Sequence, residues 1–268
     1  MLWTRSAAVV LVVGIGTIFN PTTFGKGVRP VSDGRTTESM AAAQLDRLHR
    51  FVDRYPDRAS RSGLGRSAYD VAKRAADVAI SLVALLILLV PGALLSLVIA
   101  LDTKGSPIYI DRRIGYQGHL LKVLKFRSMY ADAGNVGKYF TDDQLAQWEI
   151  DRKVEDDPRI TPVGRFLRKT SLDEVPQFIN VLLGQMSLVG PRPITKAELL
   201  WFGDGAEELL SCRPGITGLW QTLERNDATY DTGVRQQMEL SYVRKRCVGL
   251  DFRIVGGTFG AILGKTGR

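Results

Sequence analysis

VAISLVALLILLVPGALLSLVIAL, residues 78–101, is the stretch that decides how this chain folds. It runs for 24 residues without a charged side chain, in a chain whose other parts are rich in charge. The core of a soluble protein rarely needs so long an apolar run, whereas about 20 apolar residues let a helix cross a bilayer. We therefore expect this segment to insert into a membrane.

Pro91 divides this apolar segment. A proline removes one backbone hydrogen bond and clashes with the preceding turn, at about 3 kcal/mol in a regular helix. A break there leaves pieces of 13 and 10 residues, which rise ~20 and ~15 Å against a hydrocarbon core of ~30 Å. Neither piece spans a bilayer alone. The sequence therefore favours a re-entrant helix-break-helix over residues 72–102, which enters one leaflet and returns.

Positive charge on both sides of the segment favours the same arrangement. Lys73 and Arg74 precede it, and it is followed by Lys104, Arg112, Arg113, Lys122, Lys125 and Arg127. Because positive residues prefer the cytoplasmic side, both ends are expected in the cytoplasm. A proline-kinked helix that spans the bilayer is the alternative, since membrane helices tolerate proline.

Residues 1–71 are predicted to be an N-terminal extension. Arg5 precedes an apolar run from Ala7 to Phe19, which as a helix would rise only ~20 Å, and no convincing cleavage site follows it. We interpret this run as a weak anchor or an over-long start. Residues 20–70 have a linker composition. One short surface helix with local packing is expected there, because apolar residues recur at helical spacing at Leu45, Leu48, Val52 and Tyr55.

Composition narrows the classes of function without choosing one. The chain has 268 residues, 45% of them apolar, and a formal charge of +8. This charge suits an anionic partner, whether nucleic acid, a membrane surface or a phosphorylated substrate. Cys212 and Cys247 fit no metal or redox spacing and are expected to be reduced thiols. With only His49 and His119, nucleophilic or zinc chemistry based on histidine has almost no material.

Residues 103–268 are predicted to form a compact, α-rich α+β domain. The apolar stretch Phe252–Leu263 is expected to be a helix, either in the core or on the membrane surface. Extended segments are expected at Ile108–Ile110 and Leu120–Phe126, and helices near 141–153, 162–169, 175–184, 195–211 and 233–246.

The octapeptide TSLDEVPQ, residues 170–177, carries two adjacent carboxylates, Asp173 and Glu174. Ser171 and Glu174 have the spacing of a capping box, so both acids have a structural explanation in the first turn of a helix. Pro176 fits better at the first helical position. In that case the carboxylates lie just ahead of a helix N-terminus, where backbone N–H groups favour a bound phosphate.

Basic residues gather around these carboxylates in the sequence. They are Arg159, Arg165, Arg168, Lys169 and Arg192. Arg192 lies in Gly-Pro-Arg-Pro, residues 190–193, where two prolines stiffen the loop. A stiff loop suits a guanidinium that must hold a phosphate bidentately.

The sequence resembles the bacterial sugar transferases, the monotopic phosphoglycosyl transferases that start cell-surface glycan assembly. The resemblance covers residues 72–265. It rests on motifs that recur in order: Lys73-Arg74 through Asp77, Gly105–Tyr109, Arg113–Gly115, Lys125–Met129, Asp157–Thr161, Gly164–Arg168, Ser171–Gln177, Asn180–Leu182, Gly184–Pro193 and Pro214–Gln221. The family often has Ser where this chain has Val90, and Asp where it has Glu239.

This resemblance implies a fold and a set of site residues. It implies a re-entrant membrane helix broken at Pro91, followed by a cytoplasmic catalytic domain with membrane-surface helices. Asp173 and Glu174 would be catalytic and would hold Mg²⁺. The anionic substrates would be bound by Lys125, Arg127, Arg159, Arg168 and Arg192.

The resemblance also implies a reaction. Asp173, with an ordinary pKa near ~3.9, would attack the phosphorus next to the sugar of a UDP-sugar and release UMP. Polyprenyl (undecaprenyl) phosphate would then take the sugar phosphate, which initiates exopolysaccharide, O-antigen (lipopolysaccharide) or capsule assembly. The expected location is the cytoplasmic face of the bacterial inner membrane.

Other interpretations remain open at this point. The chain could be a non-catalytic, membrane-anchored scaffold, or a transferase that uses direct displacement. A nucleic-acid binder is disfavoured because it does not explain the apolar segment. The stretch Arg225–Tyr230 resembles members that handle galactose or glucose phosphate. The sequence is also compatible with a homo-oligomer.

Overall fold

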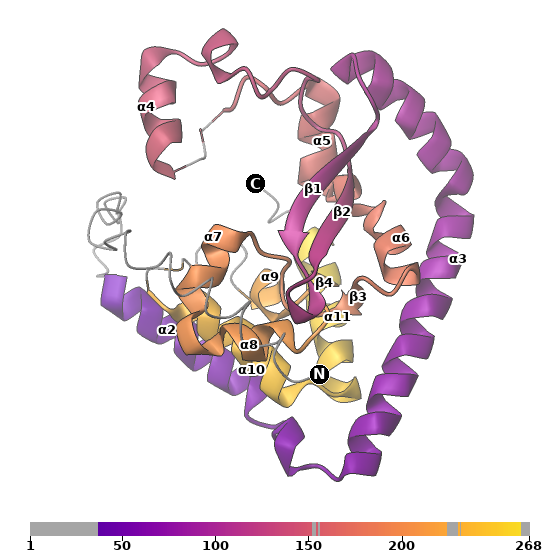
Figure 1. Cartoon of the computed structure of the whole chain (residues 1–268), viewed down its shortest axis with the longest axis vertical. Helices are drawn as coiled ribbons and strands as arrows, with labels where there is room; N and C mark the ends of the chain where they lie inside the picture. Colours follow the sequence, from indigo (N-terminus) through magenta and orange to yellow (C-terminus); the bar gives the residue numbers. More distant parts are fainter. Residues whose placement is uncertain (1–36, 152–153, 155, 224–229, 231, 264–268) are drawn as a thin grey trace, which may run out of the picture.

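The computed structural model describes residues 37–151, 154, 156–223, 230 and 232–263 (Figure 1). The predicted anchor at Ala7–Phe19 lies outside the described residues, as does most of the stretch 225–230. The described helices are α2 (Thr37–Val52), α3 (Gly63–Thr103), α4 (Asp142–Asp151), α5 (Pro162–Thr170), α6 (Gln177–Leu182), α7 (Lys196–Leu199), α8 (Ala206–Leu210), α9 (Leu219–Leu223), α10 (Val234–Lys245) and α11 (Val248–Leu263). The strands are β1 (Ile108–Ile114), β2 (Leu120–Phe126), β3 (Ser187–Val189) and β4 (Gly215–Thr217).

Helix α3 contains the whole apolar segment in 41 continuous residues. It begins after Ser62, whose side chain accepts a hydrogen bond from the Gly65 N–H, and it ends at Lys104, whose φ is +53°. The prediction of two helices separated at Pro91 is wrong in that form, because the helix continues on both sides of the proline. The ribbon instead curves along one side of the molecule and over its end (Figure 1).

Most of the apolar surface of α3 is open to the surroundings. Ile87 is 68% exposed and Leu101 72% exposed, and the helix is long and apolar enough to cross a membrane. A folded soluble protein rarely leaves so large an apolar surface uncovered. The α-rich fold is therefore that of a membrane-associated protein.

The two pairs of strands are small and separate. Strands β1 and β2 form an antiparallel hairpin, with Ile108 opposite Phe126 and Ile114 opposite Leu120. The extended segment expected at Ile108–Ile110 thus continues to Ile114. Strands β3 and β4 form a parallel pair that periodicity did not predict, because three residues are too few to show alternation.

The helices mostly follow the predicted ranges. Helices α4, α5, α6 and α10 occupy the segments expected near 141–153, 162–169, 175–184 and 233–246. The expected helix at 195–211 is divided into α7, a 3-10 turn (Leu200–Gly205) and α8. The division occurs because Gly203 adopts φ +48° and ψ −127°, which a helix cannot contain.

The largest core cluster joins the two ends of the described chain. Leu48 and Val52 of α2 are 1% exposed and pack with Tyr242 of α10 and Ile254 of α11. A surface helix that packs on nearby segments was predicted here. That prediction is wrong about the contacts, because α2 packs on α10 and α11, about 190 residues further along the chain. Helix α11 satisfies both expectations for the last segment: Ile254 is buried in the core, whereas Phe252 is 74% exposed.

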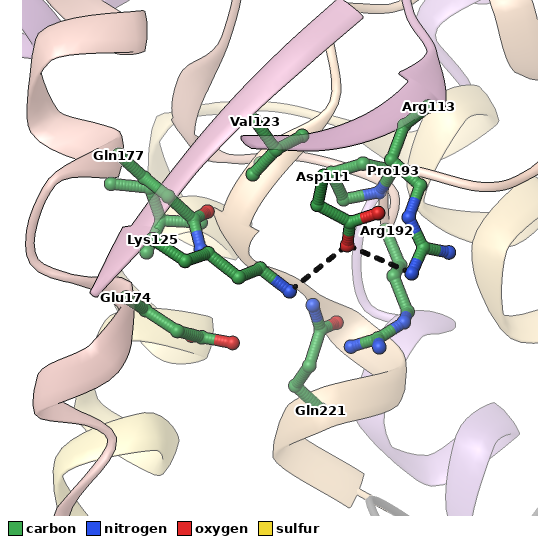
Figure 2. Close-up of a pocket in the computed structure, with 11 residues that line it drawn as sticks. Asp111, Arg113, Val123, Lys125, Glu174, Gln177, Arg192, Pro193 and Gln221 are labelled. Atoms are coloured by element: carbon green, nitrogen blue, oxygen red, sulfur yellow. Dashed lines mark ion pairs between the residues drawn. The ribbon is translucent and has the colours of Figure 1, made fainter. Parts of the chain in front are cut away.

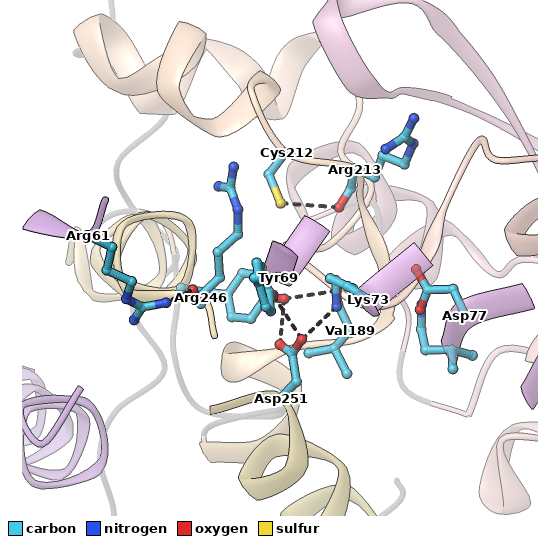
Figure 3. Close-up of polar contacts among 11 residues, drawn as sticks. Arg61, Tyr69, Lys73, Asp77, Val189, Cys212, Arg213, Arg246 and Asp251 are labelled. Carbon is cyan, nitrogen blue, oxygen red and sulfur yellow. Dashed lines mark hydrogen bonds and ion pairs between the residues drawn. The ribbon is translucent and has the colours of Figure 1, made fainter. Parts of the chain in front are cut away.

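The Asp251 carboxylate connects α3 to this core (Figure 3). Its Oδ2 accepts hydrogen bonds from the Tyr69 hydroxyl and the Lys73 ammonium, both at 2.9 Å. Its Oδ1 lies 2.8 Å from the Tyr242 hydroxyl oxygen, which is also 3.0 Å from the Val189 carbonyl, so the single hydroxyl proton is shared between these two acceptors. One carboxylate thus links α3, α10 and α11, and the bond from Tyr242 to Val189 adds β3.

Replacing Asp251 by Ala is expected to lower the free energy of unfolding by about 3 kcal/mol, because the Lys73 ammonium loses its charged partner and the Tyr69 hydroxyl loses its acceptor, while Tyr242 keeps the Val189 carbonyl. Urea unfolding of the detergent-solubilised protein measures this change. Asp46→Ala is the control, since Asp46 forms an exposed pair with Arg50 and is expected to cost under about 0.5 kcal/mol. Equal effects of the two substitutions would contradict the role given to Asp251.

Candidate active site

Asp173 and Glu174 lie on a tight turn between two helices. Helix α5 ends at Ser171, whose φ is +56°, and a 3-10 turn (Leu172–Glu174) follows. The capping box is not formed, since the Ser171 side chain makes no capping bond. Pro176 directly precedes α6, close to the position that the sequence favoured. The turn therefore presents the two carboxylates instead of burying them in a cap.

The surroundings of Asp173 shift its acidity. Burial raises the pKa of its carboxyl group, and the neighbouring Glu174 charge raises it further, while Lys125 and Arg168 act in the opposite direction. The pKa of Asp173 is thus higher than the ordinary value expected from the sequence. The two cations stabilise the ionised form that a carboxylate nucleophile requires.

A pocket opens beside this turn and collects side chains from distant elements (Figure 2). Glu174, Lys125 and Arg192 point toward one shared space, from the turn, from β2 and from the loop after β3. The pocket is also lined by Asp111, Arg113, Val123, Gln177, Pro193, Gly215, Ile216 and Gln221. The pocket thus combines two acidic side chains, Glu174 and Asp111, with three cationic ones, Arg113, Lys125 and Arg192, a set that can bind an anionic group.

The hairpin supplies two of these cationic side chains. Asp111 pairs with Arg113 at 2.9 Å and with Lys125 at 3.3 Å. Burial works against the Asp111 carboxylate, but the hydrogen bond from Arg113 and the charge of Lys125 outweigh it and lower its pKa. Arg113 also contacts Glu198 at 3.1 Å. Both cations are therefore held in position by carboxylates.

The backbone of Arg192 is held in position by the buried carboxyl group of Glu239. Its backbone N–H donates to Glu239 Oε2 at 3.2 Å, and its guanidinium lies 5.2 Å from the centre of the Trp220 ring. Gly190 starts the same loop, and a Cβ there would overlap the Arg213 carbonyl and the Gly215 backbone. Only glycine allows β3 and β4 to approach this closely, so the loop and its arginine keep one position.

Glu239 itself is 1% exposed and its Oε1 has no hydrogen-bond partner among the described residues. Burial raises the pKa of this carboxyl group to about 7, against the effects of Arg235 and Arg192. Arg235 lies between the Trp220 and Tyr230 rings, at 4.1 and 4.0 Å. Glu239, Arg235, Trp220 and Tyr230 thus pack together next to the loop that carries Arg192.

The other predicted substrate-binding residues lie outside this pocket. Arg168 donates from Nε to the Ser128 hydroxyl at 2.8 Å and is close enough to Asp173 to affect its pKa. Arg159 is 9% exposed and pairs bidentately with Asp157. Arg127 lies against Gly105, and its Nε is buried without a partner within the described structure. The fold thus brings Lys125 and Arg192 to Glu174, and Arg168 near Asp173, whereas Arg159 and Arg127 belong to the adjoining scaffold.

The two carboxylates are compatible with Mg²⁺. In the described part of the chain, no three His, Cys, Asp or Glu side chains gather as a metal site. Mg²⁺ often uses only one or two carboxylates together with substrate phosphates. The charge of Glu174 contributes to the raised pKa of Asp173, and a cation between them would relieve that repulsion. The donor set therefore fits.

Sequence reasoning gave no site role to four polar residues of the pocket, Asp111, Arg113, Gln177 and Gln221. The spacing of Asp111 and Arg113 in β1 held a usable signal, because residues two apart in a strand share one face. The register then places Asp111 beside Val123 of β2. No comparable signal exists for Gln221, whose position depends on the contact between α9 and the Gly190–Pro193 loop.

The model of the bacterial sugar transferase family matches residues 68–265. The chain belongs to this family. It is 40% identical over 204 residues to the exopolysaccharide production protein ExoY of Sinorhizobium fredii, covering 75% of this chain and 89% of that protein.

Two longer relatives carry more specific names. The undecaprenyl-phosphate galactose phosphotransferase of Salmonella typhimurium is 46% identical over 166 residues, which cover 61% of this chain and 34% of that protein. The UDP-glucose:undecaprenyl-phosphate glucose-1-phosphate transferase of Escherichia coli is 36% identical over 190 residues, or 68% of this chain and 38% of that protein. The chain thus spans little more than a third of each.

Glu239→Gln is expected to change how stability depends on pH. Because the folded-state pKa lies above the ordinary value, the folded state keeps a proton that the unfolded state loses, and stability falls as pH rises from about 4.5 to about 7. The amide keeps an acceptor for Arg192 but cannot ionise, so this fall should disappear. Unfolding free energies at pH 5 and pH 8 measure it.

Glu207→Gln, at an exposed position, is the control and should keep the wild-type pH dependence. If Glu239→Gln and the wild type lose the same stability between pH 5 and pH 8, Glu239 does not titrate as described.

Proposed function

We propose that this chain transfers a sugar 1-phosphate from a UDP-sugar to undecaprenyl phosphate, through a covalent phosphosugar intermediate on Asp173. The observation that carries the proposal is the half-buried turn of Asp173 and Glu174: Glu174 lines one pocket with Lys125 and Arg192, and Asp173 lies close enough to Lys125 and Arg168 for their charges to affect its pKa. The names of the Salmonella and Escherichia relatives support this donor and this acceptor.

The first half-reaction forms one bond and breaks one. An Asp173 carboxylate oxygen attacks the phosphorus that bears the sugar, and the bond from that phosphorus to the bridging oxygen breaks. UMP leaves with the bridging oxygen and its electron pair. Asp173 needs no general base for this step because the ionised carboxylate is itself the nucleophile.

The second half-reaction restores the enzyme. A phosphate oxygen of undecaprenyl phosphate attacks the same phosphorus, and the bond to Asp173 breaks, which returns the carboxylate. The sugar phosphate is now joined to the lipid by a diphosphate link. Two bulky anionic substrates therefore never need to occupy the pocket together.

The cationic residues perform the electrostatic work of both steps. Lys125 lies close enough to favour the ionised form of Asp173, and its ammonium points into the pocket (Figure 2). Arg192, on its stiff loop, has the geometry to bind a phosphate bidentately. We propose that Asp173 and Glu174 hold Mg²⁺, which when bound supplies positive charge to the transferring phosphoryl group.

The position of α3 gives the site access to a lipid acceptor. We propose that α3 dips into the cytoplasmic leaflet without crossing the bilayer, so that the catalytic domain stays on the cytoplasmic side. The helix reaches this geometry by curving over its length, not by ending at Pro91. The head of undecaprenyl phosphate would then meet Asp173 at the membrane surface.

Asp173→Asn is expected to reduce UMP release from UDP-galactose or UDP-glucose by roughly 10³-fold or more, because the amide is not a nucleophile. Wild type incubated with donor alone should gain the mass of one sugar phosphate on the peptide that contains Asp173. Chelation with EDTA should stop UMP release, and added Mg²⁺ should restore it.

Asp132→Asn is the matched control, because Asp132 is an exposed carboxylate that pairs with Lys138, and it should leave the rate unchanged. Normal UMP release by Asp173→Asn would favour a scaffold role for Asp173 or a different nucleophile. UMP release without any adduct would favour direct displacement. Activity that persists in EDTA would remove the metal from the proposal.

The membrane arrangement predicts that both ends of α3 face the cytoplasm. Ser67→Cys and Ser106→Cys place single thiols at exposed positions before and after the apolar segment, in a background where Cys212 and Cys247 are replaced by Ser. A membrane-impermeant maleimide should label both thiols in inside-out vesicles and neither in intact spheroplasts. Labelling of the two thiols from opposite sides would establish a spanning helix instead.

A further inference from the structure

A second cavity, of about 280 Å³, lies beside the N-terminal part of α3. Its lining includes Arg74 of α3, Ser187 at the start of β3, Arg213 before β4, and Arg246 between α10 and α11. It shares no lining residue with the pocket that contains Glu174. Figure 3 shows part of this region, with Arg246, Cys212 and Arg213 on one side of Lys73.

The cavity holds positive charge that the described carboxylates do not neutralise. Arg74 donates to the Val181 and Leu182 carbonyls at 2.6 and 2.9 Å. Arg213 donates to the Gly184 carbonyl, and Arg246 to the Val243 carbonyl. A carbonyl accepts a hydrogen bond but carries no net charge, so these three guanidinium groups keep theirs.

The lining contains two acidic side chains, Asp70 and Asp77, and both already have partners in the protein. Asp70 pairs with Arg58, and Asp77 Oδ1 accepts a bond from the Leu188 N–H at 3.0 Å. Lys73 is balanced by Asp251, which lies outside the lining. Asp77 alone therefore opposes the three arginines, and the cavity favours an anion.

Two buried donors of the lining also lack acceptors in the described structure. Ser187 is 2% exposed and its hydroxyl makes no hydrogen bond. Arg58 Nη1 is likewise buried without a partner. Neither donor atom is open to the cavity in this structure, so the attraction for an anion comes from the three arginines.

A shallow, open apolar face of α3, called the α3 groove below, adjoins this cavity. It is lined by Val71, Ala75, Val78 and Ala79, and it shares Asp70 and Arg74 with the cationic cavity. The groove runs toward the apolar segment that begins at Val78. A cationic cavity that continues into an apolar groove matches a ligand with a charged head and a hydrocarbon tail. A free phosphate or a nucleotide has no hydrocarbon chain to contact the groove.

We propose that this cavity binds the phosphate headgroup of an anionic phospholipid, with one acyl chain lying along the α3 groove. The assignment depends on α3 entering the membrane but not on the chemistry of Asp173. Cationic pockets beside membrane helices on the cytoplasmic side suit anionic headgroups. A lipid held there fixes the depth of the N-terminal part of α3, and it is a structural ligand distinct from the acceptor substrate.

Binding is tested with fluorescent short-chain phosphatidylglycerol added to the full-length, detergent-solubilised protein, with phosphatidylcholine as the neutral probe. Phosphatidylglycerol should bind and phosphatidylcholine should not. Arg246→Gln and Arg213→Gln should each weaken binding roughly tenfold, the effect of losing one charge-assisted hydrogen bond. Arg50→Gln removes the same charge from an exposed position on α2 and should bind as wild type does.

Ser187→Ala is a second control. Its hydroxyl makes no bond within the described structure and is not open to the cavity, so the substitution should leave both stability and binding of phosphatidylglycerol as in the wild type. UMP release should remain in all four variants, which shows that they fold, and Asp173→Asn should bind phosphatidylglycerol normally. Failure of the catalytic proposal thus leaves this test intact.

Three outcomes would overturn the lipid assignment. The first is equal binding of phosphatidylcholine and phosphatidylglycerol, which would mean that the net charge of the headgroup does not affect binding. The second is competition by inorganic phosphate at the concentration of the lipid probe, which would assign the cavity to a small anion. The third is wild-type binding by both Arg246→Gln and Arg213→Gln.

Discussion

The carboxylate of Asp251 is the constraint on which the arrangement of this protein depends. The exposed apolar surface of α3 favours transfer into lipid, and this surface makes few contacts that would hold the helix against the rest of the protein. Tyr69 and Lys73 attach it through hydrogen bonds to that single carboxylate, at a point before the apolar segment begins. The bond from Tyr242 ties the same carboxylate to the core. The hydrophobic effect can therefore draw α3 into a membrane while polar bonds keep the domain beside it.

The same part of α3 also supports the catalytic turn. Arg74 donates to carbonyls at the end of α6, the helix that follows Asp173 and Glu174, and Asp77 accepts from the backbone of β3, which leads to the Arg192 loop. The two walls of the pocket are thus both connected to the segment that enters the membrane. One helix therefore contacts both sides of the pocket and also carries the exposed apolar segment.

The sequence was sufficient for long or strongly patterned features and insufficient for contacts between distant segments. The apolar segment, the two extended segments that become β1 and β2, and the carboxylates just ahead of α6 follow from hydropathy, residue type and motif spacing. The preferred break at Pro91 was wrong and the alternative of a helix that continues through the proline describes α3, because the cost of a proline is offset where the chain has few other ways to satisfy its backbone. The partners of α2 and the contribution of Asp111 and Gln221 were missed because tertiary packing alone brings them into place.

The ion pairs of the hairpin have a consequence for how substrate enters. The Asp111 carboxylate contacts both Lys125 and Arg113, and Arg113 also pairs with Glu198. An anionic ligand that entered this pocket would therefore compete with carboxylates of the protein itself and would displace few mobile counterions from solution. Binding of such a ligand should then vary only weakly with ionic strength, despite the basic character of the chain.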